Sequence, residues 1–230
     1  MDFSLFFNNI IKILGKYWRV FLLEGVGYTL FLSLITVVIG SIIGALFAIG
    51  KMSKIKPLSW IITAIIEVTR GTPMLLQLYI SVFVLPSIIP VINDIKNADF
   101  ICVAVALIIN SAAYVSEIIR SGIQAVDKGQ TEAARSLGLT SKTTMIDIVL
   151  PQAIKNILPA LGNEFITVVK ETSLASTFFI GDLMTSYLKV KGNTYLTMEC
   201  LLITGVIYFV LTFCLSKALG YFERRLKARA

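Results

Sequence analysis

Long apolar runs alternate with short polar connectors along most of the chain. An α-helix rises about 1.5 Å per residue, so roughly 20 apolar residues cross a hydrocarbon core about 30 Å thick. The pattern predicts five membrane-spanning helices, at about Val26–Ile49, Leu58–Leu85, Phe100–Arg120, Lys155–Phe179 and Leu196–Leu219. We therefore expect an all-α integral membrane protein.

The second apolar run is interrupted by Glu67, Arg70, Gly71 and Pro73. It is either two short segments or one helix with a polar, kinked centre. We favour one helix, kinked by Pro73, whose freed backbone groups find protein or water rather than lipid. Glu67 and Arg70 are three residues apart and could pair on one helix face, away from lipid.

An amphipathic segment precedes the first predicted span. Between Asp2 and Val20, apolar residues recur near helical spacing, with lysine and arginine between them. This pattern predicts a helix that lies in the outer membrane interface, with a loosely ordered tail as the alternative. The expected organisation is an N-terminal segment 1–24, a membrane domain 25–219 and a basic tail 220–230.

The composition excludes an ordinary soluble domain. Of the 230 residues, 56% are hydrophobic and 15% are charged, whereas soluble domains are about 45–50% apolar and about a quarter charged. The net charge of +7 would raise nucleic acid as a partner, but the basic residues cluster in connectors beside the apolar runs, which indicates membrane anchoring instead. Without histidine or a CxxC pair, we expect no metal site.

The basic connectors also predict the orientation of the chain. Lysine and arginine gather after the first predicted span, in the segment 121–156 and in the C-terminal tail. With five spans these three regions lie on one side of the membrane, which is then the cytoplasmic side. The N-terminus is expected outside and the C-terminus inside.

The large connector at about 122–152 has a readable local design. Thr131–Leu137 is a good helix former, and Gly138 suits a left-handed helix stop. Thr140 or Ser141 could cap a second short helix that runs to about Val149. A helix–turn–helix of this kind can fill a groove on a soluble partner, although an ordinary helical hairpin between two spans fits as well.

The spacing inside this connector resembles the EAA motif of ABC importer permeases. The motif reads Glu132-Ala133-Ala134, three residues, Gly138, nine residues, Ile148, one residue, Leu150-Pro151. Three further stretches are similar to permeases for polar and basic amino acids, and these are Arg70–Leu78, which contains the RGTP sequence, Ala112–Ile123 and Lys170–Leu174, where Glu171 replaces the commoner Asp. The resemblance covers about 25–219 and indicates the histidine/glutamine/arginine/glutamate group.

The resemblance implies a mechanism and a set of partners. Two permeases, either identical or closely related, would pair around a central path in the cytoplasmic membrane of a prokaryote. Two ABC ATPase subunits, which bind ATP and Mg²⁺, would each receive one connector, and an extracytoplasmic solute-binding protein would deliver the amino acid. This chain would hold no cofactor and would not be an enzyme. The residues implied in ATPase coupling are Glu132, Ala133, Ala134, Gly138, Ile148, Leu150 and Pro151.

Glu164 is the leading candidate for contact with the substrate. It follows Lys155 by nine residues, which places it roughly 13–14 Å deep, near the bilayer midplane. A carboxylate there could pair with the ammonium group of an amino acid. Alternatively, Glu164 bonds to a neighbouring span or to Arg70 and only holds the bundle together. The candidates for the path are Glu67, Arg70, Asn163, Glu164, Thr167 and Glu171.

Three other classes of protein fit this sequence less well. A membrane enzyme is disfavoured because the chain lacks histidine and offers only Glu164 and Glu171 as a carboxylate pair. An ATP-hydrolysing subunit is disfavoured because the nearest match to a phosphate-binding loop, Gly44–Met52, departs from it in spacing and lacks Ser or Thr after Lys51. A secondary amino-acid transporter remains the alternative, although its usual matching pair of interrupted spans is absent.

Overall fold

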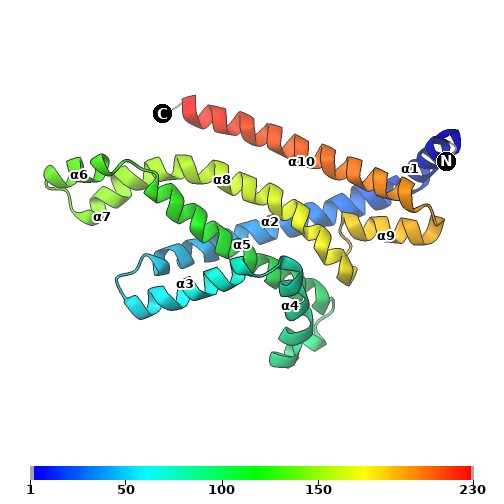
Figure 1. Ribbon diagram of the computed structural model, residues 1–230, viewed down its shortest axis with the longest axis horizontal. Helices are drawn as coiled ribbons and strands as arrows, with labels where there is room; N and C mark the ends of the chain where they lie inside the picture. The colour runs from blue at the N-terminus through cyan, green and yellow to red at the C-terminus, as the bar shows by residue number, and fades with distance from the viewer. Residues whose placement is uncertain (1–2, 229–230) are drawn as a thin grey trace. The chain divides into compact units, whose positions relative to one another are not determined.

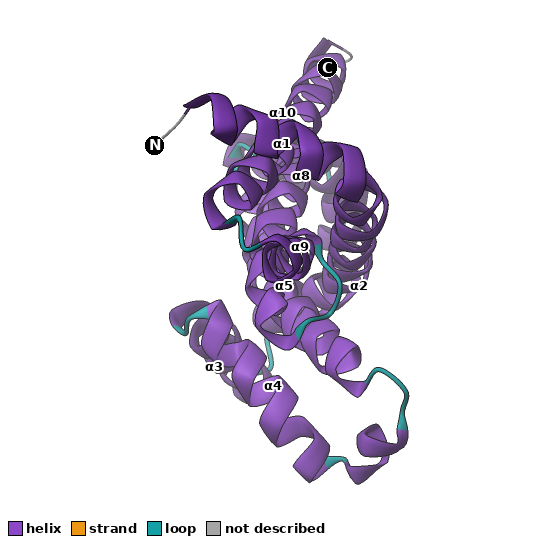
Figure 2. Cartoon of the chain, turned by 90° about the vertical axis from the view of Figure 1, so that its right-hand side faces the viewer, coloured by secondary structure: helices purple, strands orange, loops and turns teal. Residues whose placement is uncertain are grey.

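The computed structural model describes residues 3–228; Met1, Asp2, Arg229 and Ala230, which end the predicted N-terminal segment and tail, lie outside the described residues. The regular elements of residues 3–228 are all helical (Figure 2), which confirms the predicted all-α class. In chain order (Figure 1) they are α1 (Phe3–Arg19), a π-helical segment (Val20–Gly25), α2 (Val26–Lys51), α3 (Lys56–Gly71), α4 (Met74–Ile88), a 3-10 turn (Pro90–Asp94), α5 (Ala98–Gln124), α6 (Lys128–Ser136), α7 (Ser141–Thr143), a π-helical segment (Thr144–Val149), α8 (Leu150–Glu171), a 3-10 segment (Thr172–Phe178), α9 (Leu183–Thr194) and α10 (Thr197–Ala228).

The chain divides into two compact units, and α2, α5, α8 and α10 contribute to both. The first unit comprises Met1–Thr36, Thr72–Ile108 and Ile166–Leu215. The second unit comprises Val37–Gly71, Ile109–Phe165 and Ser216–Ala230.

In the first unit, α9 packs closely on the π-helical segment that precedes α2. A Cβ atom added at Gly25 would lie 2.6 Å from the Ser186 hydroxyl, so only glycine permits this approach. The Ser186 hydroxyl donates to the carbonyl of Val20 at 2.9 Å. Asp182 is fully buried and caps α9, accepting from the backbone N–H of Met184 at 2.9 Å. The buried polar side chains at the start of α9 therefore have hydrogen-bond partners, and these bonds hold the helix in place inside an apolar unit.

In the second unit, α2 and α5 approach each other through small residues. A Cβ atom added at Gly44 would lie 2.8 Å from the carbonyl oxygen of Ala112, and one at Gly40 would lie 3.1 Å from the Cβ of Ser111. Glycines four residues apart form one small face, which lets two helix backbones come close in a membrane.

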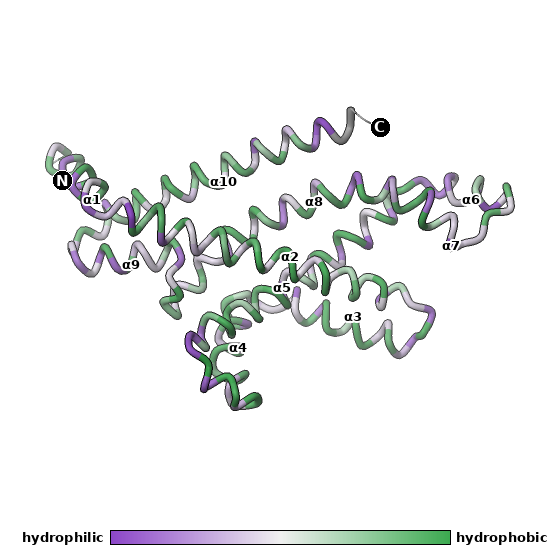
Figure 3. Tube along the Cα trace, turned by 180° about the vertical axis from the view of Figure 1, so that it is seen from behind, coloured by the Kyte–Doolittle hydropathy of each residue, from purple (hydrophilic) through white to green (hydrophobic). Residues whose placement is uncertain are grey.

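Apolar side chains cover much of the exposed surface of the long helices. Figure 3 shows hydrophobic residues along α2 and α10, and Phe209 on α10 is 66% exposed. Within residues 3–228, three helices are long and apolar enough to cross a membrane, namely Phe3–Lys51, Ala98–Gln124 and Thr197–Arg225, and α3 with α4 would supply a fourth span. The fourth predicted span, Lys155–Phe179, corresponds largely to α8, which is not among these helices. Five spans and the orientation of the termini therefore stay predictions.

The prediction that the second span is one kinked helix is wrong. Helix α3 ends at Gly71 and α4 begins at Met74, with Pro73 extended at φ −62° and ψ 136°. The ring of Pro73 pushes the preceding residue, Thr72, out of the helical region, so the chain breaks instead of bending.

The N-terminal segment is a helix, as predicted, and residues 3–19 are not a loose tail. Helix α1 continues through Val20–Gly25 into α2, so Phe3–Lys51 is one uninterrupted helix and no loop marks the predicted boundary at 24. The location of α1 in the outer membrane interface stays a prediction.

The fourth predicted span ends earlier than expected. Helix α8 stops at Glu171, and the 3-10 segment Thr172–Phe178 follows, closed by Phe179 at φ 52°. Helix α9, which comes next, was not predicted, because its mixed sequence has no clear apolar face.

Candidate functional site

The connector at about 122–152, hereafter the coupling segment, begins with the predicted helix and glycine turn. Asp127 caps α6 by accepting from the N–H of Gly129 at 2.7 Å. Gly138 has φ +84°, a conformation that costs residues with a Cβ atom. The N–H of Leu139 donates to the carbonyl of Ala134 at 3.2 Å and closes the turn. The predicted left-handed stop at Gly138 is thereby confirmed.

The second arm of the coupling segment starts where predicted but continues beyond its predicted end. Thr140 caps it, with its hydroxyl accepting from the N–H of Thr143 at 3.2 Å. The helix then passes through the π-helical segment Thr144–Val149 into α8, so the prediction of a short helix ending near Val149 is wrong. The wider π turn accommodates the ring of Pro151, which would clash with a carbonyl in a regular helix interior.

The two arms pack into a small rigid body. Ala134 is 2% exposed where α6 lies on the π-helical segment, and the Arg135 guanidinium donates to the carbonyl of Leu139 at 2.6 Å across the turn. Leu137 points the other way and is 83% exposed. Of the predicted coupling residues, Ala134 is buried and Ile148 half-buried, whereas the following are exposed: Glu132, Ala133, Gly138, Leu150 and Pro151.

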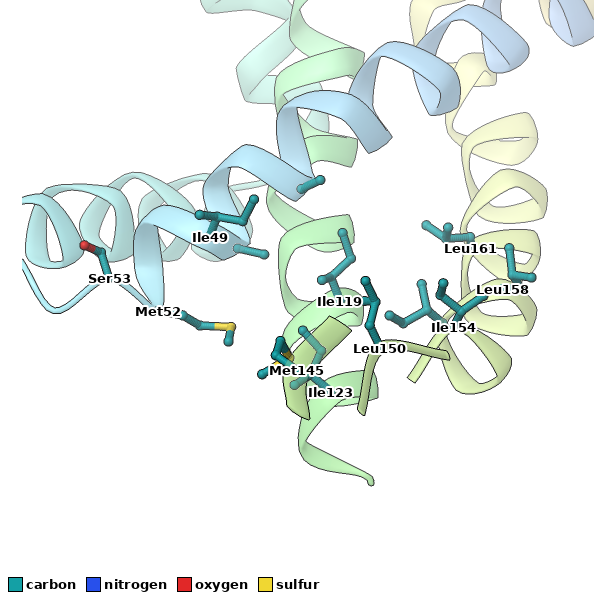
Figure 4. A pocket seen from close by; sticks show the side chains of 13 residues that line it. Ile49, Met52, Ser53, Ile119, Ile123, Met145, Leu150, Ile154, Leu158 and Leu161 are labelled. Carbon is teal, nitrogen blue, oxygen red and sulfur yellow. The ribbon is translucent and has the colours of Figure 1, made fainter. Parts of the chain in front are cut away.

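An apolar groove of about 830 Å³ lies beside the base of the second arm. Figure 4 shows Met52, which directly follows α2, Ile119 from α5, and Met145, Leu150 and Ile154 from the second arm and α8 around it. The side chains at the junction of the coupling segment and α8 thus border open apolar space rather than a filled core.

A charge cluster surrounds Glu117 on α5. This carboxylate accepts from the Lys51 ammonium at 2.7 Å and from two nitrogens of Arg120 at 2.7 and 3.0 Å. Arg70 adds an ion pair at 3.9 Å and lies over the ring of Tyr114, 5.3 Å from its centroid. The cluster therefore ties the ends of α2 and α3 to α5.

This cluster was not predicted from the sequence. Within residues 3–228, Arg70 pairs with Glu117 and not with Glu67, which is exposed on α3, so the expected Glu67–Arg70 pair is wrong. An ionisable residue within an otherwise apolar helix is itself a signal of function, and this signal could have singled out Glu117.

Glu164 is 9% exposed and accepts from the Ser111 hydroxyl at 3.0 Å. It thus bonds to α5, a neighbouring helix, as the structural alternative expected. Asn163 and Thr167 are exposed, and Glu171 is half-buried near the end of α8. A single uninterrupted helix joins the coupling segment to Glu164.

These features define a class: a helical membrane subunit whose exposed helix–turn–helix is linked by one continuous helix to a buried carboxylate. The chain belongs to the family of binding-protein-dependent transport system inner membrane components, whose model matches residues 37–228. The arginine transport system permease protein ArtQ of Bacillus subtilis is 43% identical over 208 residues, covering 90% of this chain and 93% of that protein. A putative glutamine transport system permease protein GlnP of Rickettsia bellii is 40% identical, covering 96% and 98%.

Solved structures agree with this family. The crystal structure of an amino acid ABC transporter with histidines has a TM-score of 0.86 and 45% identity, covering 92% of this chain and 96% of that one. The MetNI methionine ABC transporter, in inward-facing form, shares the fold with a TM-score of 0.71 at 19% identity, covering 92% and 98%. The predicted family of ABC importer permeases is confirmed. The family is a non-enzymatic transport component, and nothing in these matches favours a secondary transporter.

Proposed function

We propose that this chain is the membrane-spanning subunit of an ATP-driven importer for polar or charged amino acids in the cytoplasmic membrane of a prokaryote. The relatives named for arginine and glutamine transport support the substrate class. The observation that carries the mechanism is the unbroken helix from Ser141 to Glu171, because it connects the exposed coupling segment to the buried Glu164.

The coupling segment is the part of this chain that contacts the ATPase and is displaced when the ATPase changes state. Leu137 is a large apolar side chain that is 83% exposed at the tip of a rigid turn, and such a group favours insertion into a groove of another protein. The partner is an ABC ATPase that holds ATP and Mg²⁺. ATP binding drives the change of state because the ATPase pair binds it better when closed.

The long helix carries this displacement into the membrane. Ser141 and Glu164 are 23 residues apart, which is roughly 30–35 Å along a helix. A helix moves as a body over such a length, and the apolar groove beside Met145 and Leu150 leaves room for its base to shift. A second permease, identical or related, completes the path, and an extracytoplasmic binding protein supplies the amino acid.

Glu164 is the proposed contact for the ammonium group of the substrate. The other candidates for lining the substrate path are Asn163, Thr167, Glu171, Arg70 and Glu67. An ionisable residue within a membrane helix is by default a candidate for a substrate pathway, and Glu164 lies on the helix that continues from the coupling segment.

Replacing Leu137 tests the coupling. In proteoliposomes with the ATPase, Leu137→Asp is expected to abolish ATP-driven uptake of radiolabelled amino acids and to weaken ATPase association, since a charge enters an apolar contact. Tyr195→Asp is the matched control, because Tyr195 is 88% exposed and lies outside the coupling segment. Wild-type uptake by Leu137→Asp, or uptake driven by an ion gradient without ATP, would contradict the proposal.

Replacing Glu164 and Ser111 in parallel separates charge from helix contact. Glu164→Gln keeps the size and removes the charge, whereas Ser111→Ala removes one hydrogen bond and keeps the charge. A substrate role predicts loss of uptake in Glu164→Gln with basal ATP hydrolysis retained, and a small effect of Ser111→Ala. Equal, small effects of both changes would show that Glu164 only holds α8 to α5.

A further inference from the structure

The first unit contains an aromatic pocket that the transport mechanism above does not use. Its volume is about 390 Å³, which suits one side chain or a small molecule. The described residues that line it are Tyr28, Phe31, Asn97, Asp99, Phe100, Phe178, Phe179 and Ile180. Five of the eight are aromatic, and Asp99 carries the one formal charge among them.

The rings are held in place by their neighbours. Phe31 stacks on Phe100 with centroids 6.5 Å apart, and Phe178 is supported from outside the pocket by Tyr79 at 5.3 Å. Phe179 has φ 52°, a strained value for a bulky residue, and its side chain remains 65% exposed. Backbone strain of this kind persists where the surrounding structure requires it, and it often accompanies binding sites.

Asp99 lies in the first turn of α5, where the helix dipole favours a carboxylate. The dipole explains an acid at this position but not the aromatic residues around it. The Asp99 side chain is exposed and forms no hydrogen bond or ion pair with any residue in 3–228. Ring faces combined with a carboxylate are the groups that recognise an ammonium or guanidinium ion.

Most of the lining residues lie at or beyond the ends of α5 and α8 that the coupling segment does not join. Tyr28 and Phe31 lie near the start of α2, Asp99 begins α5, and Phe179 follows the end of α8. The coupling segment connects the opposite ends of α5 and α8. In the proposed orientation the pocket therefore opens on the extracytoplasmic side, where a solute-binding protein docks.

We propose that this pocket receives a lysine or arginine side chain that the binding protein presents on docking, an inference that rests on the proposed function. A protein side chain fits better than a free amino acid because a free amino acid also brings a carboxylate. Asp99 would repel that carboxylate, and no lysine or arginine is among the described lining residues.

The test measures binding of N-acetyl-lysine methylamide to the full-length chain in nanodiscs of neutral lipid, by ligand-observed NMR titration. This probe is a lysine side chain without a free carboxylate, and N-acetyl-norleucine methylamide is its uncharged match. We expect the lysine amide to bind, with affinity lowered about three- to tenfold by Asp99→Asn or by Phe179→Leu. Asp94→Asn, an exposed acid outside the pocket, is the control and should change nothing.

Three results would overturn the proposal: no binding of the lysine amide, equal binding of the norleucine amide, or unchanged affinity in Asp99→Asn. Tighter binding of free L-lysine would also overturn it, because the pocket would then recognise an amino acid rather than a protein side chain. Since the titration needs neither ATP nor an ATPase, its failure is distinguishable from a failure of ATP-driven transport.

Discussion

The coupling segment and the Glu117 cluster belong to the same unit, but different kinds of contact hold them together. The coupling segment is built from bonds between near neighbours, such as Thr143 to Thr140 and Leu139 to Ala134. In the Glu117 cluster, Lys51 reaches a carboxylate that lies 66 residues further along the chain. The coupling segment is a local motif, whereas the Glu117 cluster exists only once three helices have packed.

This difference separates two tasks in the protein. A local motif keeps its shape while the membrane helices move, which suits a part that presents one surface to a soluble partner. A cluster that joins the ends of α2, α3 and α5 depends on their arrangement. A change in the cluster should therefore affect the stability of the helix bundle, and a change in the coupling segment should affect transport.

The largest effect is expected from Glu117→Gln. Removing this carboxylate leaves Lys51, Arg70 and Arg120 close together without their shared counter-charge, and breaking such a half-buried network costs about 3–5 kcal/mol at most. We expect a lower unfolding temperature in detergent, measured by differential scanning fluorimetry.

Glu67→Gln provides the control for this change, because Glu67 is an exposed acid on α3 that forms no ion pair with any other residue in 3–228. Its effect should stay within about 0.5 kcal/mol. A Glu117→Gln protein as stable as the control would show that the cluster is a surface feature and would remove its contrast with the coupling segment.

An intermediate effect is expected from Gly138→Val. Space is not limiting, because nothing lies within 4 Å of a Cβ atom added there, but a β-branched residue at φ +84° costs about 1–2 kcal/mol. The turn should shift and uncouple ATP hydrolysis from transport, while insertion into the membrane stays normal.

Gly138→Asn is the matched change, because asparagine tolerates the left-handed region. It should retain most of the uptake measured in proteoliposomes. If valine and asparagine behave alike, the left-handed turn at Gly138 is not what the coupling depends on.

The same contrast explains what could be predicted from the sequence. The turn at Gly138 and the cap at Thr140 were predictable because each depends on residues within a few positions. The predicted end of the second arm near Val149 is wrong, because the π-helical segment that carries the helix on into α8 leaves no mark in the hydrophobic pattern. The family followed from spacing over several stretches, which needs no three-dimensional information.

The cluster at Glu117 and the Ser111–Glu164 bond were not predictable in the same way. Glu117 sits in a stretch noted for its resemblance alone, and its partner Lys51 was counted as a cytoplasmic anchor. Pairing across 66 residues requires the packing of α2 on α5, which Gly40 and Gly44 make possible. Helix packing of this kind is a property of two surfaces and is invisible in either segment alone.

The smallest effect is expected from Arg70, the outermost member of the cluster. Its side chain is 39% exposed and lies 3.9 Å from Glu117, whereas Arg120 approaches the same carboxylate to 2.7 Å. Exposed ion pairs contribute about 0.2–1 kcal/mol, and the ring of Tyr114 adds a cation–π contact of similar size. A double-mutant cycle of Arg70→Gln with Glu117→Gln should therefore give a coupling energy below about 1 kcal/mol, and the cycle with Arg120→Gln should give a larger one. Both cycles are measured by the unfolding free energy in the same detergent. A larger coupling energy for Arg70 than for Arg120 would mean that Arg70 contributes most to holding α3 in place. The cluster would then mainly connect α3 to α5, and the pair within α5 would matter less.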